Sequence, residues 1–520
     1  MNKIYKVIWS KTRNCYVAVA EFVKRNGKGG SVLNRRHIAA ALAAVAICAA
    51  PTGAQANTGG HWDGSKYIGD APEYNVSINE EVNGIAYGRY TTDASGATLS
   101  IVTGGKVKQY VTGGHSDSGN ASQNAVTISG GMVNGGAVGG IARAGDAIGN
   151  TVTISGGTVE YGGVTGGYSE FLDAKDNTVT ISGGTVGTDV YGGHSERGKA
   201  SQNAVTISGG TVGGDVYGGL GGHTTEKNAV SISGGEVNGT VYGGRSADGN
   251  ASQNTVTISG GTVGSDVYGG FGGHNAEGNT VTISSGTVNG NVYGGVSGLF
   301  STTGNTVILS RQGIEAPPDI NGTLFGGFSK SGGTVLNNTL QVEAVGLSAP
   351  EIQNFENYRF VLPSDVKKGD TMLTLKGQGA DLTIDGTKVD MAVAKDGGLN
   401  IGFGESVTLL HKTGGTGAFN VENVTGAVQT SKLDGVSTGF DVMKYKLDKP
   451  DHEDKLNVTV SELHLYGDGG TNTPGQRETG NTLIINSGKA SVAFGGRAKD
   501  RKSTRLNSSH IQKSRMPSSA

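Results

Sequence analysis

Apolar and polar residues alternate in a short motif, N-[TA]-V-[TS]-I-S-[GS]-G, that recurs along the middle of the chain. In a β-strand, successive side chains point to opposite faces, so Val126 and Ile128 are predicted to face inward and Ala125 and Thr127 outward. Weaker copies of the motif lie near residues 74, 98 and 338. The motif's Asn recurs every 25–27 residues, at Asn124, Asn150, Asn177, Asn203, Asn228, Asn254, Asn279 and Asn305.

A second motif, V-Y-G-G, keeps the same interval, with its tyrosines at Tyr191, Tyr217, Tyr242, Tyr268 and Tyr293. Each motif ends in Gly-Gly, which we interpret as a turn because Gly adopts positive φ without a steric cost. The residues after V-Y-G-G vary most and are predicted to form a loop. Each repeat is therefore expected to contain three short strands and three turns.

A unit of about 26 residues cannot bury its own Val and Ile face, but stacked units can. We therefore predict an all-β fold, a parallel β-solenoid (β-helix) whose coils each add about 4.8 Å of height. The recurring Asn side chains are expected to form a hydrogen-bonded ladder along the stack, since a buried amide without partners costs ~1–3 kcal/mol.

The predicted organisation has six parts. An N-terminal export segment (1–56) precedes the solenoid repeats (57–345) and a β region without repeats (346–466), in which Gly thins and Leu, Lys and Asp increase. A polar linker (467–480) leads to a resumed repeat (481–499), where Asn481 takes the Asn position. A basic tail (500–520) follows.

Composition narrows the classes of protein. Gly accounts for 93 of 520 residues but Pro for only 9, which excludes collagen and disfavours helices. The net charge of −2 conceals an acidic body of −14 over residues 57–499, so nucleic acid is not an expected partner. Both cysteines, Cys15 and Cys48, lie in the export segment, which leaves residues 57–520 without a disulfide framework.

The N-terminus has the pattern of an export signal. Arg35 and Arg36 precede an apolar run of 13 residues, 38–50, which is too short to span a bilayer. Ala54 and Ala56 form a small-x-small cleavage site, which places the mature start near residue 57.

About 28 further residues precede this signal, beginning MNKIYKVIW and continuing with VAVAE at 17–21. This stretch resembles the extended signal peptide region of Gram-negative type V secreted proteins. The resemblance implies partners in the inner-membrane export machinery and the outer-membrane assembly machinery, and a location at the cell outer membrane or cell surface. The region at 346–466 is similar to the segment that follows Gly-rich repeats in some monomeric autotransporters.

Residues 500–510 (DRKSTRLNSSH) and 514–520 (SRMPSSA) resemble the translation of a sequencing-library adapter. We therefore expect the natural sequence to depart from this one near Lys499. An autotransporter ends in an outer-membrane β-barrel, so the resemblance implies that the chain is truncated before its barrel.

Candidate chemistry is sparse. His115, His194, His223 and His274 follow Gly-Gly, where we expect exposed loops rather than metal ligands. The run at 117–119 (DSG) has part of a serine-protease motif, but nothing in the repeat supplies a base and an oxyanion hole. The aspartates of the turns recur too irregularly for calcium-binding repeats, so neither a metal nor a cofactor is expected.

Two functional hypotheses remain. The first is a surface-displayed passenger that acts as an adhesin or biofilm protein through its repeats, binding host or bacterial surface ligands. The second is a secreted enzyme, a protease or esterase, whose catalytic part is missing from this sequence. A two-partner-secretion exoprotein is a further alternative, because such proteins also carry extended signals. We favour the first hypothesis and expect no enzyme activity.

Overall fold

The computed structural model describes residues 58–465 except 64, 72–73, 312, 314, 364–365, 386–388, 394–403, 423–427, 433–439 and 451–453, together with the backbone of three strands outside that range. The chain divides into two compact units, Met1–Gln55 and Ala56–Ala520. In the first unit, β1 (Tyr5–Ser10) pairs antiparallel with β2 (Cys15–Ala20). Ala54, Ala56, the predicted linker and the predicted adapter tail lie outside the described residues.

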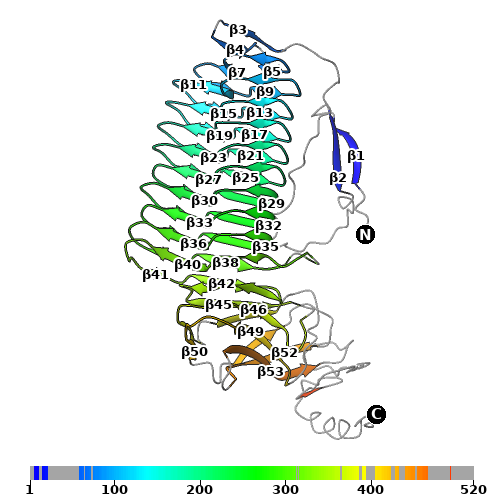
Figure 1. The fold of residues 1–520 in the computed structure, drawn as a ribbon, viewed down its shortest axis with the longest axis vertical. Helices are drawn as coiled ribbons and strands as arrows, with labels where there is room; N and C mark the ends of the chain where they lie inside the picture. Colours follow the sequence, from blue (N-terminus) through cyan, green and yellow to red (C-terminus); the bar gives the residue numbers. More distant parts are fainter. Residues whose placement is uncertain are drawn as a thin grey trace, which may run out of the picture. The chain divides into compact units, whose positions relative to one another are not determined.

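The second unit contains a stack of coils: each coil lies on the one before it, and the strands of successive coils pair in parallel (Figure 1). The described residues contain strands, turns and bends but no helix, so the predicted all-β parallel solenoid is confirmed. Equivalent residues pair directly, as in the series Val126, Val152 and Val179. Among these residues there is accordingly no helix with the length and apolar character needed to cross a membrane.

The first sheet contains the T-V-T-I strands and, on the same sheet, the short T-V strands that follow most of them. The T-V-T-I strands are β5 (Asn75–Ile78), β9 (Thr98–Ile101), β13 (Ala125–Ile128), β17 (Thr151–Ile154), β21 (Thr178–Ile181), β25 (Ala204–Ile207), β29 (Ala229–Val237), β32 (Thr255–Val263), β35 (Thr280–Val288), β38 (Thr306–Leu309), β42 (Thr339–Val342), β45 (Asn357–Leu362) and β48 (Val389–Val393). The short strands are β6 (Glu81–Val82), β10 (Lys106–Val107), β14 (Met132–Val133), β18 (Thr158–Val159), β22 (Thr185–Val186), β26 (Thr211–Val212) and β39 (Asp319–Ile320).

The second sheet contains the V-Y-G-G strands and begins with an antiparallel pair, β3 and β4. Its strands are β3 (Gly60–Trp62), β4 (Lys66–Gly69), β7 (Ile85–Tyr90), β11 (Val111–Ser116), β15 (Ala137–Ala142), β19 (Val164–Ser169), β23 (Val190–Ser195), β27 (Val216–Gly221), β30 (Val241–Ser246), β33 (Val267–Gly272), β36 (Val292–Ser297), β40 (Leu324–Ser329) and β44 (Ile352–Gln353).

A third sheet runs through the region that we expected to be a variable loop. It consists of two-residue strands, so a typical coil has four strands rather than the predicted three. These are β8 (Ala94–Ser95), β12 (Ala121–Ser122), β16 (Ala147–Ile148), β20 (Ala174–Lys175), β24 (Ala200–Ser201), β28 (Thr225–Glu226), β31 (Ala251–Ser252), β34 (Ala276–Glu277), β37 (Thr302–Thr303) and β41 (Val335–Leu336).

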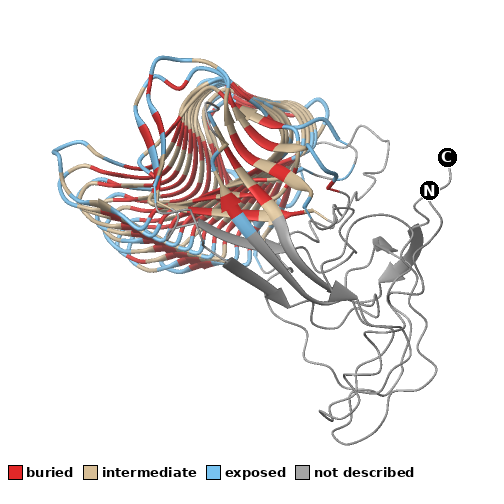
Figure 2. Cartoon of the chain, turned by 90° about the horizontal axis from the view of Figure 1, so that it is seen from below, coloured by how far each residue is buried: buried red, intermediate tan, exposed pale blue. Residues whose placement is uncertain are grey.

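Buried residues recur from coil to coil along the stack (Figure 2). The core contains the Val and Ile columns of the first sheet together with the Val column of the second. Val126 and Ile128 are fully buried, whereas Ala125 and Thr127 are partly exposed, so the predicted inward and outward faces are confirmed. Burying a Val or Ile side chain contributes about 1.5–3 kcal/mol. One continuous cluster of buried side chains extends from Tyr67 to Val458.

The two Gly-Gly pairs of each repeat have different conformations. After the T-V-T-I strand, the second Gly has positive φ, from 72° at Gly131 to 85° at Gly286. The pair forms the predicted turn in the coils up to Gly210, whereas β29, β32 and β35 continue through it with a shift in register. The Gly-Gly of V-Y-G-G instead lies inside a six-residue strand, for example within β23, and neither Gly192 nor Gly193 has positive φ. The predicted second turn is therefore wrong: this pair is extended.

Parallel pairing continues past residue 345, where we expected the repeats to end. Leu324 pairs with Ile352 and Thr339 with Asn357, and β45 then pairs with β48. The backbone thus keeps coiling after the sequence motif has disappeared, because the requirement for apolar residues at alternate positions is still met. Phe360 and Leu362 are fully buried in β45.

The remaining strands form two further sheets. In the larger one, β43 (Leu347–Ala349), β46 (Thr371–Leu375) and β49 (Ser406–Lys412) are parallel, and β53 (Lys455–Leu465), β52 (Phe440–Asp448) and β51 (Val428–Lys432) follow antiparallel. A short strand, β54 (Val492–Ala493), pairs with β53, and β47 (Leu382–Asp385) pairs with β50 (Phe419–Glu422).

Candidate functional site

The predicted Asn residues occupy one buried column, in which Asn124, Asn150, Asn177, Asn203, Asn228, Asn254, Asn279, Asn305 and also Asn338 are at most 1% exposed. From Asn124 to Asn305 each side chain repeats the same contacts, and Asn338 ends the series as the acceptor from Asn305. The Nδ2 of Asn177 donates to Oδ1 of Asn203 at 3.0 Å, and the same oxygen accepts the backbone N–H of Asn177 at 3.0 Å. Nδ2 of Asn177 also donates to the carbonyl of Ala147 at 2.9 Å. The column is therefore an internal scaffold and is not available to a ligand.

The second Gly of V-Y-G-G provides the space that this column requires. A Cβ on Gly193 would lie 2.2 Å from Oδ1 of Asn203, and one on Gly219 would lie 2.5 Å from the Asn228 side chain. A Cβ on the preceding glycine, Gly192, would lie 2.3 Å from the carbonyl oxygen of Gly218 in the next coil. Both glycines thus allow close approach rather than a turn, which the one-dimensional pattern did not reveal.

The residue before each ladder Asn has positive φ, between 54° and 64° from Gln123 to Gly304. Several of these residues are not Gly, including Gln123, Asp176, Gln202 and Lys227. Non-Gly residues rarely adopt this conformation. These residues form a corner of the coil, and we attribute its backbone conformation to the hydrogen bonds of the ladder Asn that follows it.

The repeat tyrosines form an aromatic column on the second sheet. Tyr191, Tyr217, Tyr242, Tyr268 and Tyr293 stack successively and end on Phe325, with ring centroids 4.7–4.9 Å apart and rings within 6° of parallel. Burial raises the pKa of each of these tyrosines above its ordinary value. The ring faces inside the column cover one another, so a ligand reaches only the ring edges.

Aspartates in the preceding turn link this column to the coil stack. Asp215 Oδ2 accepts from the Tyr217 hydroxyl at 3.0 Å, and its Oδ1 accepts the backbone N–H of Thr240 in the next coil at 2.8 Å. Asp189 and Asp266 make the same pair of contacts in their own coils. These carboxylates therefore have a structural role, and no cluster of three His, Cys, Asp or Glu ligands occurs among the described residues.

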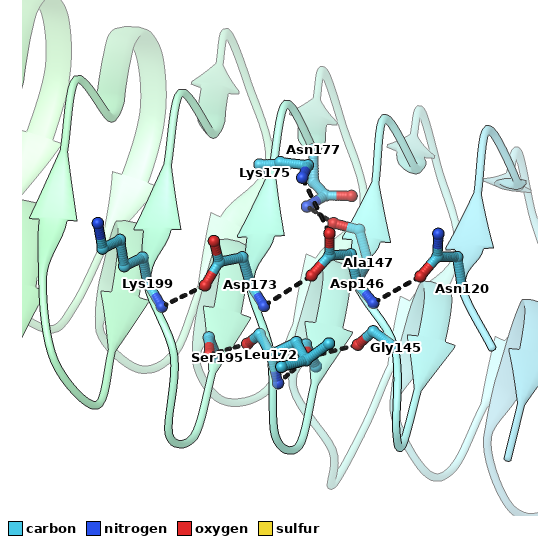
Figure 3. A network of polar contacts seen from close by, with 11 residues as sticks. Asn120, Gly145, Asp146, Ala147, Leu172, Asp173, Lys175, Asn177, Ser195 and Lys199 are labelled. Atoms are coloured by element: carbon cyan, nitrogen blue, oxygen red, sulfur yellow. Dashed lines mark hydrogen bonds and ion pairs between the residues drawn. The ribbon is translucent and has the colours of Figure 1, made fainter. Parts of the chain in front are cut away.

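A further polar ladder borders the third sheet (Figure 3). The carboxylate of Asp146 accepts the backbone N–H of Asp173, whose own carboxylate accepts the backbone N–H of Lys199. Lys175 Nζ also lies 2.9 Å from Asp146 Oδ2. Ser195 bridges coils by donating to the carbonyl of Leu172. These contacts order the loops that vary in sequence.

Within the described residues, the candidate histidines belong to no group of three or more potential metal ligands. His115 and His194 lie in β11 and β23, half-buried or buried, and not in exposed loops as we expected. His194 stacks on Tyr191 with centroids 5.2 Å apart, and burial lowers the pKa of both histidines. His223 is exposed in a loop, as predicted.

The protease-like run does not have the arrangement of a catalytic triad. His115 Nε2 lies 3.1 Å from Asp117 Oδ1, and the other ring nitrogen, Nδ1, is buried without a partner. Neither ring nitrogen therefore contacts Ser118. Asp117 instead accepts from the Tyr90 hydroxyl at 2.6 Å.

Fold and N-terminal signal together define an exported β-solenoid protein. Residues 1–50 match the family described as the extended signal peptide of the type V secretion system. The chain thus carries a type V secretion signal, and its solenoid is consistent with an autotransporter passenger. This signal implies export across the inner membrane and transfer to the outer-membrane assembly machinery. No curated protein and no solved structure matches the chain.

Proposed function

We propose that this type V passenger is displayed on the cell surface and acts as an adhesin or biofilm protein, by binding and not by catalysis. The supporting observation is the strict register of its coils: Thr180, Thr206, Ser231 and Thr257 pair in sequence, so this part of the outer surface repeats a hydroxyl side chain at each level. Repeated weak contacts along one scaffold raise the overall affinity without any strong single site.

The proposal also rests on which polar side chains already have hydrogen-bond partners within the stack of coils. The recurring polar side chains, such as the buried Asn203 and the turn residue Asp215, bond to neighbouring coils. What remains free for a partner is the outward surface, which suits recognition of an extended surface ligand.

A shortened passenger tests the proposal. Deleting residues 177–253 removes three whole coils and joins Asp176 to Asn254, which preserves the order of corner residue and ladder Asn. Bacteria that express the full gene, the deletion or neither are compared for biofilm mass and for attachment to host and bacterial cells, at equal surface levels by immunofluorescence. We expect attachment to fall sharply with three coils fewer. Equal attachment with and without the gene would refute the proposal.

A further inference from the structure

The outer face of the first sheet between residues 151 and 287 has an unusual composition. Three columns of outward side chains run along it, and we call them together the threonine face. The first contains Thr151, Thr178, Ala204, Ala229, Thr255 and Thr280; the second contains Thr153, Thr180, Thr206, Ser231, Thr257 and Thr282; the third contains Thr158, Thr185, Thr211, Glu236, Thr262 and Thr287.

The columns form a regular grid. Parallel pairing places equivalent threonines of neighbouring coils about 4.8 Å apart along the stack, and the first two columns are separated by two residues of one strand, about 6.6 Å. These side chains are partly or fully exposed, as the alternating burial of β17 and β21 shows. Within the described part of the chain, no side-chain hydrogen bond uses their hydroxyls. They are therefore available to a ligand.

Strand propensity explains part of this composition, because Thr is enriched in strands and Lys and Glu are depleted from them. Propensity alone does not require the same residue type at nearly every outward position of successive coils. Here Glu236 is the single charged residue in the three columns defined above. The same coils place many charges on the loop edge, including Glu170, Asp173, Lys175, Glu196 and Lys199. Charge is thus depleted from one face specifically.

The chemistry of the face selects its partner. A face without cations does not attract phosphates or sulfates, and a face without aromatic or aliphatic anchors lacks the features that dominate protein–protein affinity. The stacked tyrosines cannot bind sugars by their ring faces, because neighbouring rings cover those faces. What fits is a neutral polymer that presents hydroxyl groups at a spacing close to that of the coils.

We propose that the threonine face binds a neutral, unbranched, β-linked polysaccharide that lies extended along the solenoid, with sugar hydroxyls paired to threonine hydroxyls. An extended β-1,4-linked chain advances by roughly one coil height per sugar. Because successive sugars are rotated by half a turn, the same sugar hydroxyls face the threonines at every second coil. Each coil binds weakly and the array binds by avidity. This inference rests on the proposed function and names its ligand.

The test is affinity electrophoresis of the purified full chain in native gels that contain hydroxyethylcellulose. We expect the polymer to retard the wild-type chain. The triple variant Thr153→Val, Thr180→Val and Thr206→Val keeps the shape of the second column but removes three adjacent hydroxyls, and should weaken the apparent affinity roughly tenfold or more. The matched control, Ser201→Ala, Ser252→Ala and Thr303→Val, alters outward positions of the third sheet and should migrate as the wild type does. Circular dichroism and thermal melting verify that all three chains are folded.

Three results would overturn the inference: no retardation of the wild type, equal retardation of the threonine variant, or equal retardation by flexible α-linked dextran. Retardation by heparin alone would also overturn it, because an anionic ligand requires the charged loops. The two proposals fail separately. If the polymer is not bound but attachment still depends on the gene, only this inference fails; if the polymer is bound but attachment is independent of the gene, the adhesin proposal fails.

Discussion

Replacing one Asn of the buried ladder tests the central structural argument. Asn203 is 1% exposed, and its side chain takes part in four hydrogen bonds that link three coils. In Asn203→Ala, the backbone N–H of Asn177 loses its acceptor inside the core. An unsatisfied buried donor costs about 1–3 kcal/mol, and the missing amide also leaves a small cavity beside Gly193. We therefore expect a loss of roughly 2–4 kcal/mol in local stability.

Hydrogen exchange measured by mass spectrometry suits this variant, because a repeat array does not unfold strictly in one step. Peptides that cover residues 174–207 should exchange faster by the factor that corresponds to the lost free energy, whereas peptides near residue 300 should be unaffected. Thr206→Ala, an outward change in the same coil, is the control and should cost less than about 0.5 kcal/mol. If Asn203→Ala exchanges no faster than Thr206→Ala, the ladder does not stabilise the coils and the reasoning is wrong.

Three more predictions concern the same coils. Gly193→Ala should lower the free energy of unfolding by more than about 2 kcal/mol in chemical denaturation, because the added Cβ would overlap Asn203. The control Gly377→Ala should be nearly neutral, because its Cβ would have its nearest neighbour at 3.8 Å. Equal effects of the two substitutions would contradict this argument. Gln202→Gly should raise the free energy of unfolding by up to about 1 kcal/mol, because φ is 56° there and Gly adopts positive φ without strain. A loss of stability like that expected for Ser201→Gly would show that this corner is not strained. Burial lowers the pKa of His194 below its ordinary 6.5, so on acidification the unfolded chain takes up a proton before the folded chain does. The free energy of unfolding should therefore fall as the pH drops below about 6.5. His194→Gln should flatten this dependence in thermal melts at about pH 5–8, and an unchanged profile would count against the burial of this ring.

Much of the fold could be predicted because its signals are local. The alternation around Val126 and Ile128 identifies a strand and its buried face, and the interval of about 26 residues identifies the coil. A strand has a side-chain period of two, and a repeat too short to bury its own apolar face must stack. The Asn column also follows from this register, because residues at the same place in each repeat lie above one another.

The signals were weaker where one motif has two possible conformations. Gly-Gly after Ile207 and Gly-Gly after Tyr191 look alike in the sequence, yet one forms a turn with positive φ and the other an extended strand. The difference depends on Asn203, ten residues further along the chain, whose buried side chain requires space at Gly193. No local propensity contains that information.

The sequence by itself determined the all-β class, the coil length, the inward Val and Ile columns and the type V export signal, because each is encoded within one repeat or one N-terminal segment. The tertiary structure alone decided the third sheet, the placement of His194 in a strand, the extended Gly-Gly of V-Y-G-G and the continuation of coils beyond residue 345. These features depend on contacts between neighbouring coils, and such contacts exist only once the chain has closed its turns and placed residues about 26 apart within hydrogen-bonding or van der Waals distance.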